Sequence, residues 1–164
     1  VSVHSKGLGF GCAFSVLLPL SEQHDDLPAT PETSDEDNRL GGLTVLLVDD
    51  SEDVLLVLQM LLEMEGADVK AFGDPRLALE AANTNRYDLI ISDIGMPVMD
   101  GHELMKKLRK LDHLQATPSI ALTGYGAAND QKKTAESGIN HHVSKPVAHE
   151  SLIVLINSLR SERD

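Results

Sequence analysis

The chain has 164 residues, a formal net charge of −12, 41% apolar residues and a single cysteine. This length fits one domain of ordinary size plus some linker. The negative charge would be repelled by nucleic-acid phosphates and by anionic membrane surfaces, so we expect neither as a direct partner. One cysteine cannot form an internal disulfide, and no apolar run approaches the roughly 20 residues of a membrane span. A reducing, cytoplasmic setting is expected.

The first 42 residues differ in composition from the rest of the chain. They hold two basic and seven acidic residues, and the stretch from Ser21 to Asn38 has two prolines and one strongly apolar residue, Leu27. Such a stretch cannot bury enough apolar surface to offset the entropy lost on ordering. We therefore predict a flexible acidic linker over residues 21–42.

From Leu43 onward, short apolar runs alternate with segments of helical periodicity. This alternation is typical of a parallel sheet covered by helices on both faces. Because crossover connections are right-handed, the pattern predicts an α/β fold with a doubly wound, five-stranded parallel sheet and five helices. The predicted strands are 43–48, 67–72, 88–92, 119–123 and 140–144, and the predicted helices are 52–65, 75–85, 101–111, 128–137 and 148–160.

Polar residues follow several of these strands, at the sheet edge where ligands bind in such folds. They are Asp49, Asp50, Asp93, Thr123 and Lys145. Three nearby carboxylates repel one another unless a cation holds them together, and hard oxygen ligands suit Mg²⁺ better than Zn²⁺. Taken singly, Asp49 or Asp50 could equally be a helix cap. The full set predicts a site for a divalent ion.

Four motifs resemble the receiver domain of two-component response regulators. They are VLLVDDSED (45–53), ISDIGMPVMDG (91–101), ALTGYG (121–126) and SKPV (144–147). The resemblance implies a receiver domain over residues 43–164 with the flavodoxin-like strand order 2-1-3-4-5. It also implies a phosphoacceptor that receives a phosphoryl group from a phosphohistidine-bearing kinase or phosphotransfer domain, changes conformation, and catalyses its own phosphorylation and dephosphorylation.

The same resemblance implies a role for each acidic residue. Asp93 would be the phosphoacceptor, and Mg²⁺ would bind directly to Asp50, Asp93 and the backbone carbonyl of Gly95. Asp49 would bind the ion through water. An aspartate nucleophile, a magnesium ion and a lysine form a sufficient set for phosphoryl transfer.

The remaining site residues are assigned in the same way. Thr123 would donate its hydroxyl to a phosphoryl oxygen, and Lys145 would pair with the phosphoryl group or with the Asp93 carboxylate. Pro146 resembles the family's cis proline. Receivers usually carry Tyr or Phe three residues before this lysine, where the chain has His142. We hypothesise that His142 and Tyr125 together replace the usual aromatic switch; the alternative is that both are exposed and idle.

Residues 1–20 resemble the last stretch of a histidine-kinase ATPase domain. Gly7, Gly9 and Gly11 are spaced as in a loop near phosphates, and residues 14–20 would be a closing strand that ends in Leu-Pro-Leu. An irregular tail is the alternative. The resemblance implies a hybrid histidine kinase whose ATP-binding core is not in this chain and whose parent protein could be membrane-anchored.

Two other function classes are weighed against the receiver. An aspartate-nucleophile phosphohydrolase would share the acidic strand ends, but its D-x-D motif is absent because Ile94 and Gly95 follow Asp93. A degenerate receiver could act only as a binding module, although retention of all five site residues argues against it. In the predicted helix 52–65, Leu55, Leu56 and Leu62 lie outside the core stripe expected at Val54, Val57, Leu58 and Leu61. They could form a docking face or simply be buried.

Overall fold

A computed structural model describes residues 2–5, 12–15, 38–124 and 137–161, in two compact units that divide between residues 32 and 33. The first unit contains β1 (Ser2–His4) paired antiparallel with β2 (Ala13–Ser15). The closing strand predicted at 14–20 is described only as far as Ser15. The glycine-rich loop and residues 21–37 of the predicted linker lie outside the described residues. No described helix is long and apolar enough to cross a membrane.

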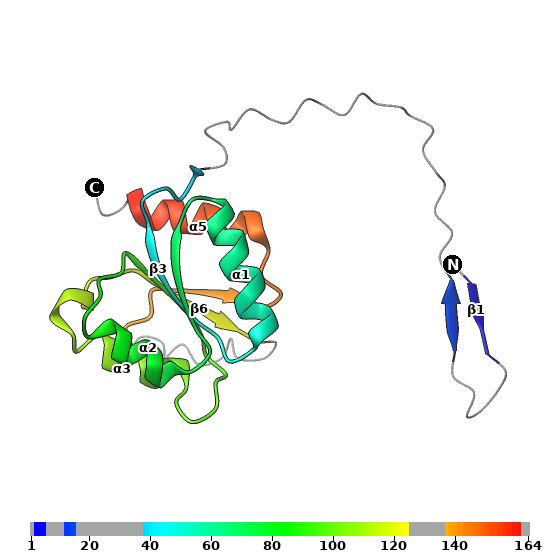
Figure 1. Ribbon diagram of the computed structural model, residues 1–164, viewed down its shortest axis with the longest axis horizontal. Coiled ribbons are helices and arrows are strands. Elements are labelled where there is room, and N and C mark those ends of the chain that lie inside the picture. Colours follow the sequence, from blue (N-terminus) through cyan, green and yellow to red (C-terminus); the bar gives the residue numbers. More distant parts are fainter. Residues whose placement is uncertain (1, 6–11, 16–37, 125–136, 162–164) are drawn as a thin grey trace. The chain divides into compact units, whose positions relative to one another are not determined.

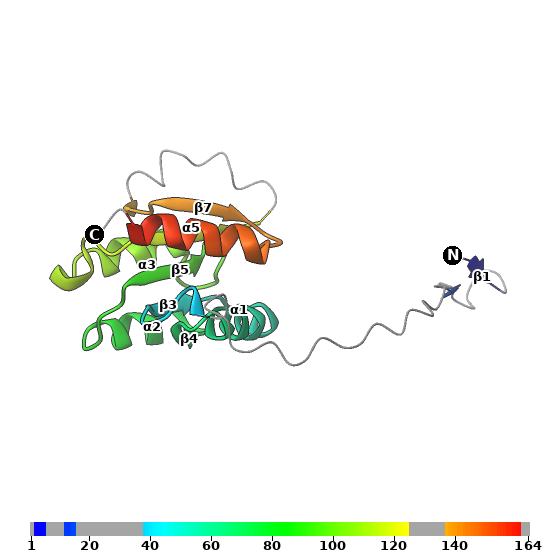
Figure 2. The ribbon, with the colours of Figure 1, turned by 90° about the horizontal axis from the view of Figure 1, so that it is seen from above.

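The second unit is built on a parallel sheet of five strands. Their order is β4-β3-β5-β6-β7, with β4 and β7 at opposite edges (Figure 2). Counted within the domain, this is the predicted order 2-1-3-4-5, so the predicted fold is confirmed. The strands are β3 (Thr44–Val48), β4 (Asp68–Phe72), β5 (Leu89–Asp93), β6 (Ser119–Thr123) and β7 (His141–Ser144).

Helices cover both faces of the sheet (Figure 1). Val45 and Leu47 of β3 pack into the core under α1 (Glu52–Met64) and α5 (His149–Ser161). Leu46 and Val48 pack into a second core with α2 (Pro75–Ala82) and α3 (Gly101–Leu108). Because successive side chains of a strand point to opposite faces, a strand buried on both sides is apolar throughout. The predicted fourth helix, 128–137, lies outside the described residues except for its last residue.

Two helices end three residues earlier than predicted, at Ala82 and Leu108. After α2, the side-chain amides of Asn83 and Asn85 donate to the carbonyls of Leu79 and Ala81 and so cap the last turn. After α3, the N–H of Leu111 donates to the carbonyl three residues back, and a 3₁₀ turn follows at Asp112–Leu114. Side-chain caps and hydrogen bonds to the carbonyl three residues back commonly close a helix. Residues 83–85 are Asn-Thr-Asn and carry no apolar stripe, whereas Leu111 continues the apolar spacing of α3 without extending the helix.

The core-facing stripe of α1 also differs from the predicted one. Leu58 and Leu62 are buried, whereas Val57 is 55% exposed. Residues four apart share a helix face, so the buried pair defines a stripe rotated away from Val57. The prediction that Val57 faces the core was wrong, and Leu62 follows the alternative of burial, because α1 has more apolar residues than one face can hold.

The folded domain begins before β3. Residues 38–42 form turns, and Leu40, within the range predicted to be linker, is completely buried in the core under α1 and α5. Its N–H donates to the Glu65 carbonyl at 2.7 Å. One apolar residue in a polar stretch gives little signal in the sequence, yet it ties this segment to the domain.

Candidate functional site

Three aspartates meet at the carboxyl edge of the sheet. Asp49 follows β3, and Asp93 is the last residue of the neighbouring strand β5. Carboxylate oxygens of Asp49, Asp50 and Asp93 all lie within 4.8 Å of one another. Asp49 is fully buried and Asp93 is 6% exposed, whereas Asp50 faces solvent. The structure therefore brings together the three carboxylates that the sequence singles out.

Backbone amides orient two of these carboxylates. The N–H of Ser51 donates to Asp49 Oδ1 at 3.0 Å, and the N–H of Gly95 donates to Asp93 Oδ2 at 3.1 Å. Hydrogen bonds to an ionised carboxylate are among the stronger ones in proteins. They fix the direction of both side chains before any ligand arrives.

Lys145 is the cation of this cluster. Its Nζ lies 2.6 Å from Asp49 Oδ2 and 3.0 Å from Asp93 Oδ1. Burial lowers the pKa of Lys145, but hydrogen bonds to the two aspartates outweigh it, so the net pKa is raised and the ammonium stays charged. The Lys145–Pro146 peptide bond is cis, and the Lys145 N–H donates to the Thr123 carbonyl at 2.8 Å. We call Asp49, Asp50, Asp93 and Lys145 the aspartate cluster.

The other predicted site residues have fewer described contacts with the aspartate cluster. Thr123 ends β6 at the same sheet edge, 5% exposed and one residue beyond the partner of Asp93. His142 is exposed on β7, opposite Ala121, and among described residues has no hydrogen bond or ion pair with the aspartate cluster. Partial burial and the nearby His102 and His141 lower the pKa of His142. Tyr125 lies outside the described residues.

The charge of the cluster fits a divalent cation. Three carboxylates and one ammonium leave two negative charges unbalanced, and all the acidic ligands are hard oxygens. Such donors suit Mg²⁺, which retains several waters. The residues present therefore fit the predicted ion.

One residue that supports the site was not singled out from the sequence. A Cβ added to Gly101 would lie 2.2 Å from the carbonyl oxygen of Asp93. The Gly101 N–H also donates to the Ile94 carbonyl at 3.1 Å. Only glycine permits this close approach, which packs the start of α3 against the end of β5. The glycine that closes the ISDIGMPVMDG motif was the available signal.

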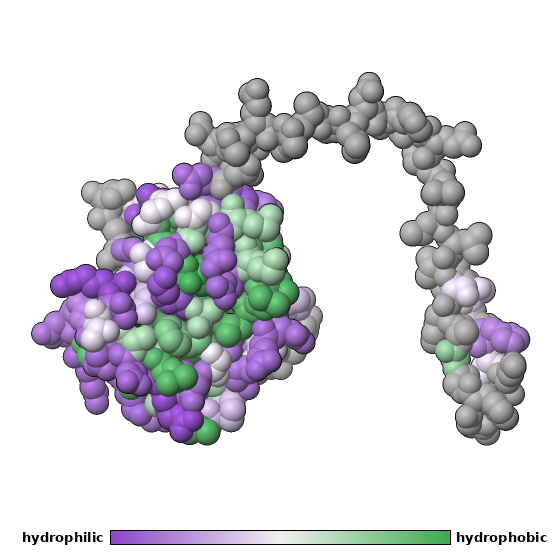
Figure 3. All heavy atoms as spheres, viewed as in Figure 1, coloured by the Kyte–Doolittle hydropathy of each residue, from purple (hydrophilic) through white to green (hydrophobic). Residues whose placement is uncertain are grey.

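An apolar groove lies beside the cluster. It has a volume of about 360 Å³, and its two walls are α1 and the segment 145–147. Apolar side chains gather on the side of the domain where α1 lies (Figure 3). The lining residues are Asp53, Val54, Val57, Leu58, Leu61, Lys145, Pro146 and Val147, and the exposed apolar residues of α1 are Leu56, Val57, Met60 and Met64.

The family model of the response regulator receiver domain matches residues 45–157. The chain belongs to this family. It is therefore a two-component receiver domain, a phosphoacceptor module, and the resemblance predicted from its motifs is confirmed. Nothing in the comparisons supports the phosphohydrolase or the binding-only receiver.

Three proteins illustrate the relationship. An uncharacterized 14.6 kDa protein of Leptolyngbya boryana is 37% identical over 71% of this chain and 89% of its own length. The sensor protein EvgS of Escherichia coli is 29% identical over 92% of this chain, which spans only 12% of EvgS. The solved receiver of the sensor histidine kinase PA1611 of Pseudomonas aeruginosa has a TM-score of 0.67 and 28% identity, covering 73% of this chain and 98% of that receiver; its structure contains a magnesium ion coordinated in the active site cleft.

Proposed function

We propose that this receiver accepts a phosphoryl group on Asp93 from a phosphohistidine. An Asp93 carboxylate oxygen would attack the phosphorus atom, the phosphorus–nitrogen bond would break with its electron pair going to the imidazole, and an aspartyl phosphate would form. The observation that carries this proposal is the Lys145 ammonium, 3.0 Å from Asp93 Oδ1 and placed at the sheet edge with two further carboxylates.

The other residues would each act at a stated group. Lys145 balances the Asp93 carboxylate before transfer and pairs with a phosphoryl oxygen afterwards, while Thr123 donates its hydroxyl to another. Mg²⁺, bound directly by Asp50, Asp93 and the Gly95 carbonyl and through water by Asp49, would supply positive charge to the incoming phosphoryl oxygens. The cluster's unbalanced negative charge supports this role for the ion.

The groove beside α1 supports a helical, phosphohistidine-bearing partner. Its lining combines apolar residues of α1 with Lys145, which also pairs with Asp49 and Asp93, so a helix laid in it would present a histidine to the aspartate cluster. Amphipathic helices commonly dock into grooves in this way. The exposed apolar residues of α1 would then be partner contacts.

We also infer a hybrid histidine kinase as the parent protein, with residues 1–20 as the end of its ATPase domain, residues 21–42 as linker and residues 43–164 as receiver. A match to EvgS that covers 92% of this chain extends well into the first 42 residues, beyond the receiver. The antiparallel pairing of β1 and β2 is consistent with the end of a sheet. A cytoplasmic location of the receiver belongs to the same proposal.

For the conformational switch, we propose that His142 takes the position of the usual aromatic residue and that Tyr125 shields the aspartyl phosphate. The support is the position of His142, three residues before Lys145 on β7, the strand paired with the β6 strand that ends at Thr123. Dephosphorylation rates equal to wild type in both His142→Ala and Tyr125→Ala would refute this role.

The phosphoacceptor proposal is tested with acetyl phosphate, a donor that needs no protein partner. Intact mass should show the gain of one phosphoryl group in the presence of Mg²⁺, and none with a chelator or in Asp93→Asn. A phosphoryl group that survives Asp93→Asn, or forms equally well in chelator, would refute the assignment.

A further inference from the structure

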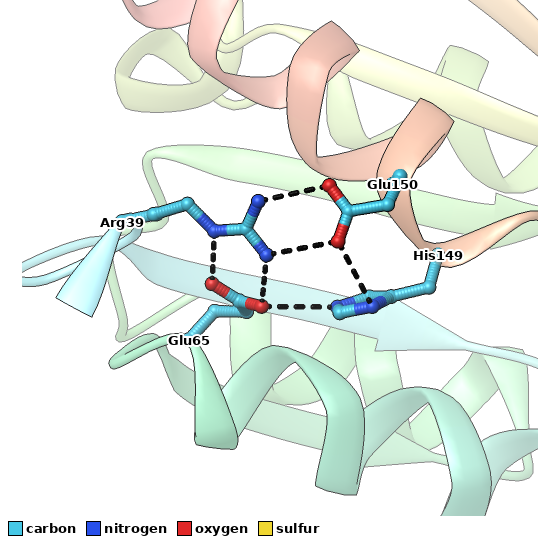
Figure 4. Close-up of polar contacts among 4 residues, drawn as sticks. All are labelled: Arg39, Glu65, His149 and Glu150. Carbon is cyan, nitrogen blue, oxygen red and sulfur yellow. Dashed lines mark hydrogen bonds and ion pairs between the residues drawn. The ribbon is translucent and has the colours of Figure 1, made fainter. Parts of the chain in front are cut away.

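Four charged or titratable residues from three separate segments meet at one corner of the domain (Figure 4). Arg39 precedes β3, Glu65 follows α1, and His149 and Glu150 begin α5. Arg39 Nε donates to Glu65 Oε2 at 2.6 Å, and Arg39 Nη1 donates to Glu150 Oε2 at 2.9 Å. One guanidinium therefore bridges an acid at the end of α1 and an acid in the first turn of α5. We call these four residues the latch.

The ion pair between Arg39 and Glu65 is partly buried, which distinguishes it from an ordinary surface pair. The Glu65 side chain is 8% exposed and that of Arg39 is 31% exposed, although Glu150 faces solvent. Hydrogen bonds from Arg39 hold the pKa of both Glu65 and Glu150 below the ordinary value. An arginine fork that binds a buried carboxylate through two nitrogens is among the better-defined ion pairs in proteins.

His149 completes the corner. Its buried Nε2 is 3.1 Å from Glu65 Oε1 and has no hydrogen-bond partner among the described residues, so that contact has the distance of an ion pair without hydrogen-bond alignment. Its Nδ1 lies 3.7 Å from Glu150. The imidazole thus fills the space between the two acids, and Arg39 supplies the permanent positive charge.

The position of the latch relates it to the groove. One wall of the groove is α1, whose last turn leads into Glu65; the other is the segment 145–147, two residues before His149. Glu65 directly follows α1, and Glu150 lies in α5, three residues beyond the segment 145–147. Without Arg39, these two carboxylates would face each other and repel. Arg39 therefore ties the end of α1 to the start of α5, next to the two groove walls.

We propose that the latch is a conformational device by which residues 38–43, which directly precede β3, control the width of the α1 groove. Movement of that segment would withdraw Arg39, separate Glu65 from Glu150 and let α1 and α5 move apart. The regulatory meaning rests on the proposed function, since the groove matters only if a phosphohistidine partner docks there. The geometry of the latch itself does not depend on that function.

The test measures the separation of α1 and α5 directly. Spin labels are placed on Met60→Cys and Val154→Cys, both exposed, in a Cys12→Ser background. Arg39→Gln should broaden the distance distribution and add a longer component. The matched control is Arg76→Gln, because Arg76 also pairs with a carboxylate, Asp74, but only two residues away on one segment. Arg76→Gln should leave the distribution unchanged.

The outcomes separate the latch from the proposed function. A distribution that is the same in Arg39→Gln and wild type, or that broadens equally in Arg76→Gln, overturns the latch. If Arg39→Gln does not fold, Arg39→Lys is measured at rising salt, where screening of partly exposed pairs should broaden the distribution; a distribution that salt leaves unchanged would again overturn it. Acetyl phosphate should phosphorylate Arg39→Gln as it does wild type, and failure to phosphorylate wild type would refute the proposed function alone.

Discussion

The aspartate cluster and the latch use the same kinds of groups but differ in how much negative charge is left unbalanced. In the aspartate cluster, three carboxylates share one ammonium, and two negative charges remain. In the latch, two carboxylates share one guanidinium, and a histidine lies between them. A cluster with excess negative charge attracts a further cation, whereas a nearly balanced one is already complete. The first is suited to taking up an ion and a phosphoryl group, and the second to holding segments together.

The largest expected effect concerns the buried residue beneath the latch. Leu40→Ala should lower the free energy of unfolding by about 3 kcal/mol, because it removes a fully buried side chain and leaves a cavity. Leu77→Ala, at a site that is 55% exposed, is the matched control and should cost much less. Urea unfolding measures both. Similar small losses in the two variants would show that residues 38–42 contribute nothing to the folded domain.

Addition of Mg²⁺ should stabilise the protein through the aspartate cluster and not through the latch. At Mg²⁺ concentrations about 100-fold above the dissociation constant, binding to the folded state should add about 2.7 kcal/mol of stability. Asp50→Asn should lose most of this gain and Arg39→Gln should keep it, as read from the shift in melting temperature on adding Mg²⁺ and then a chelator. An equal shift in Asp50→Asn would mean that the ion binds elsewhere.

At the latch we expect a smaller, pH-dependent effect on the free energy of unfolding. Because the folded-state pKa of Glu65 lies below its ordinary value of 4.5, this residue stabilises the fold above that pH, and the contribution is lost as the pH falls through the lowered pKa. Glu65→Gln should therefore cost about 1 kcal/mol near neutral pH and little in acid. Unfolding free energies of both proteins across this range give the comparison. A constant difference at all pH values would contradict the assigned ionisation.

The smallest effect on stability is expected in the groove. Val57→Thr, at an exposed position of α1 that lines the groove, should change the free energy of unfolding by less than about 0.5 kcal/mol. It should nevertheless slow phosphoryl transfer from an autophosphorylated histidine kinase by about fivefold, as expected for a central interface contact. Val154→Thr on α5 is the exposed apolar control. Equal transfer rates in the two variants would remove α1 from the docking surface.

The fold and the aspartate cluster could be predicted from the sequence because both follow local rules. The central strands β3 and β5 read as largely apolar runs, and parallel topology carries the residues at the ends of β3, β5 and β7 to one edge. The latch could not be predicted. Arg39, Glu65, His149 and Glu150 have ordinary surface composition, and only the packing of Leu40, α1 and α5 brings them together. The buried face of α1 was equally hidden, since leucines occur on several of its sides.

The most direct test of the account asks which residue carries the phosphoryl group. The protein is phosphorylated with acetyl phosphate and Mg²⁺, and borohydride reduction converts the aspartyl phosphate to homoserine, whose position tandem mass spectrometry then identifies. We predict homoserine at residue 93 alone. Homoserine at Asp49 or Asp50, or none anywhere in a protein that has gained a phosphoryl group, would contradict it.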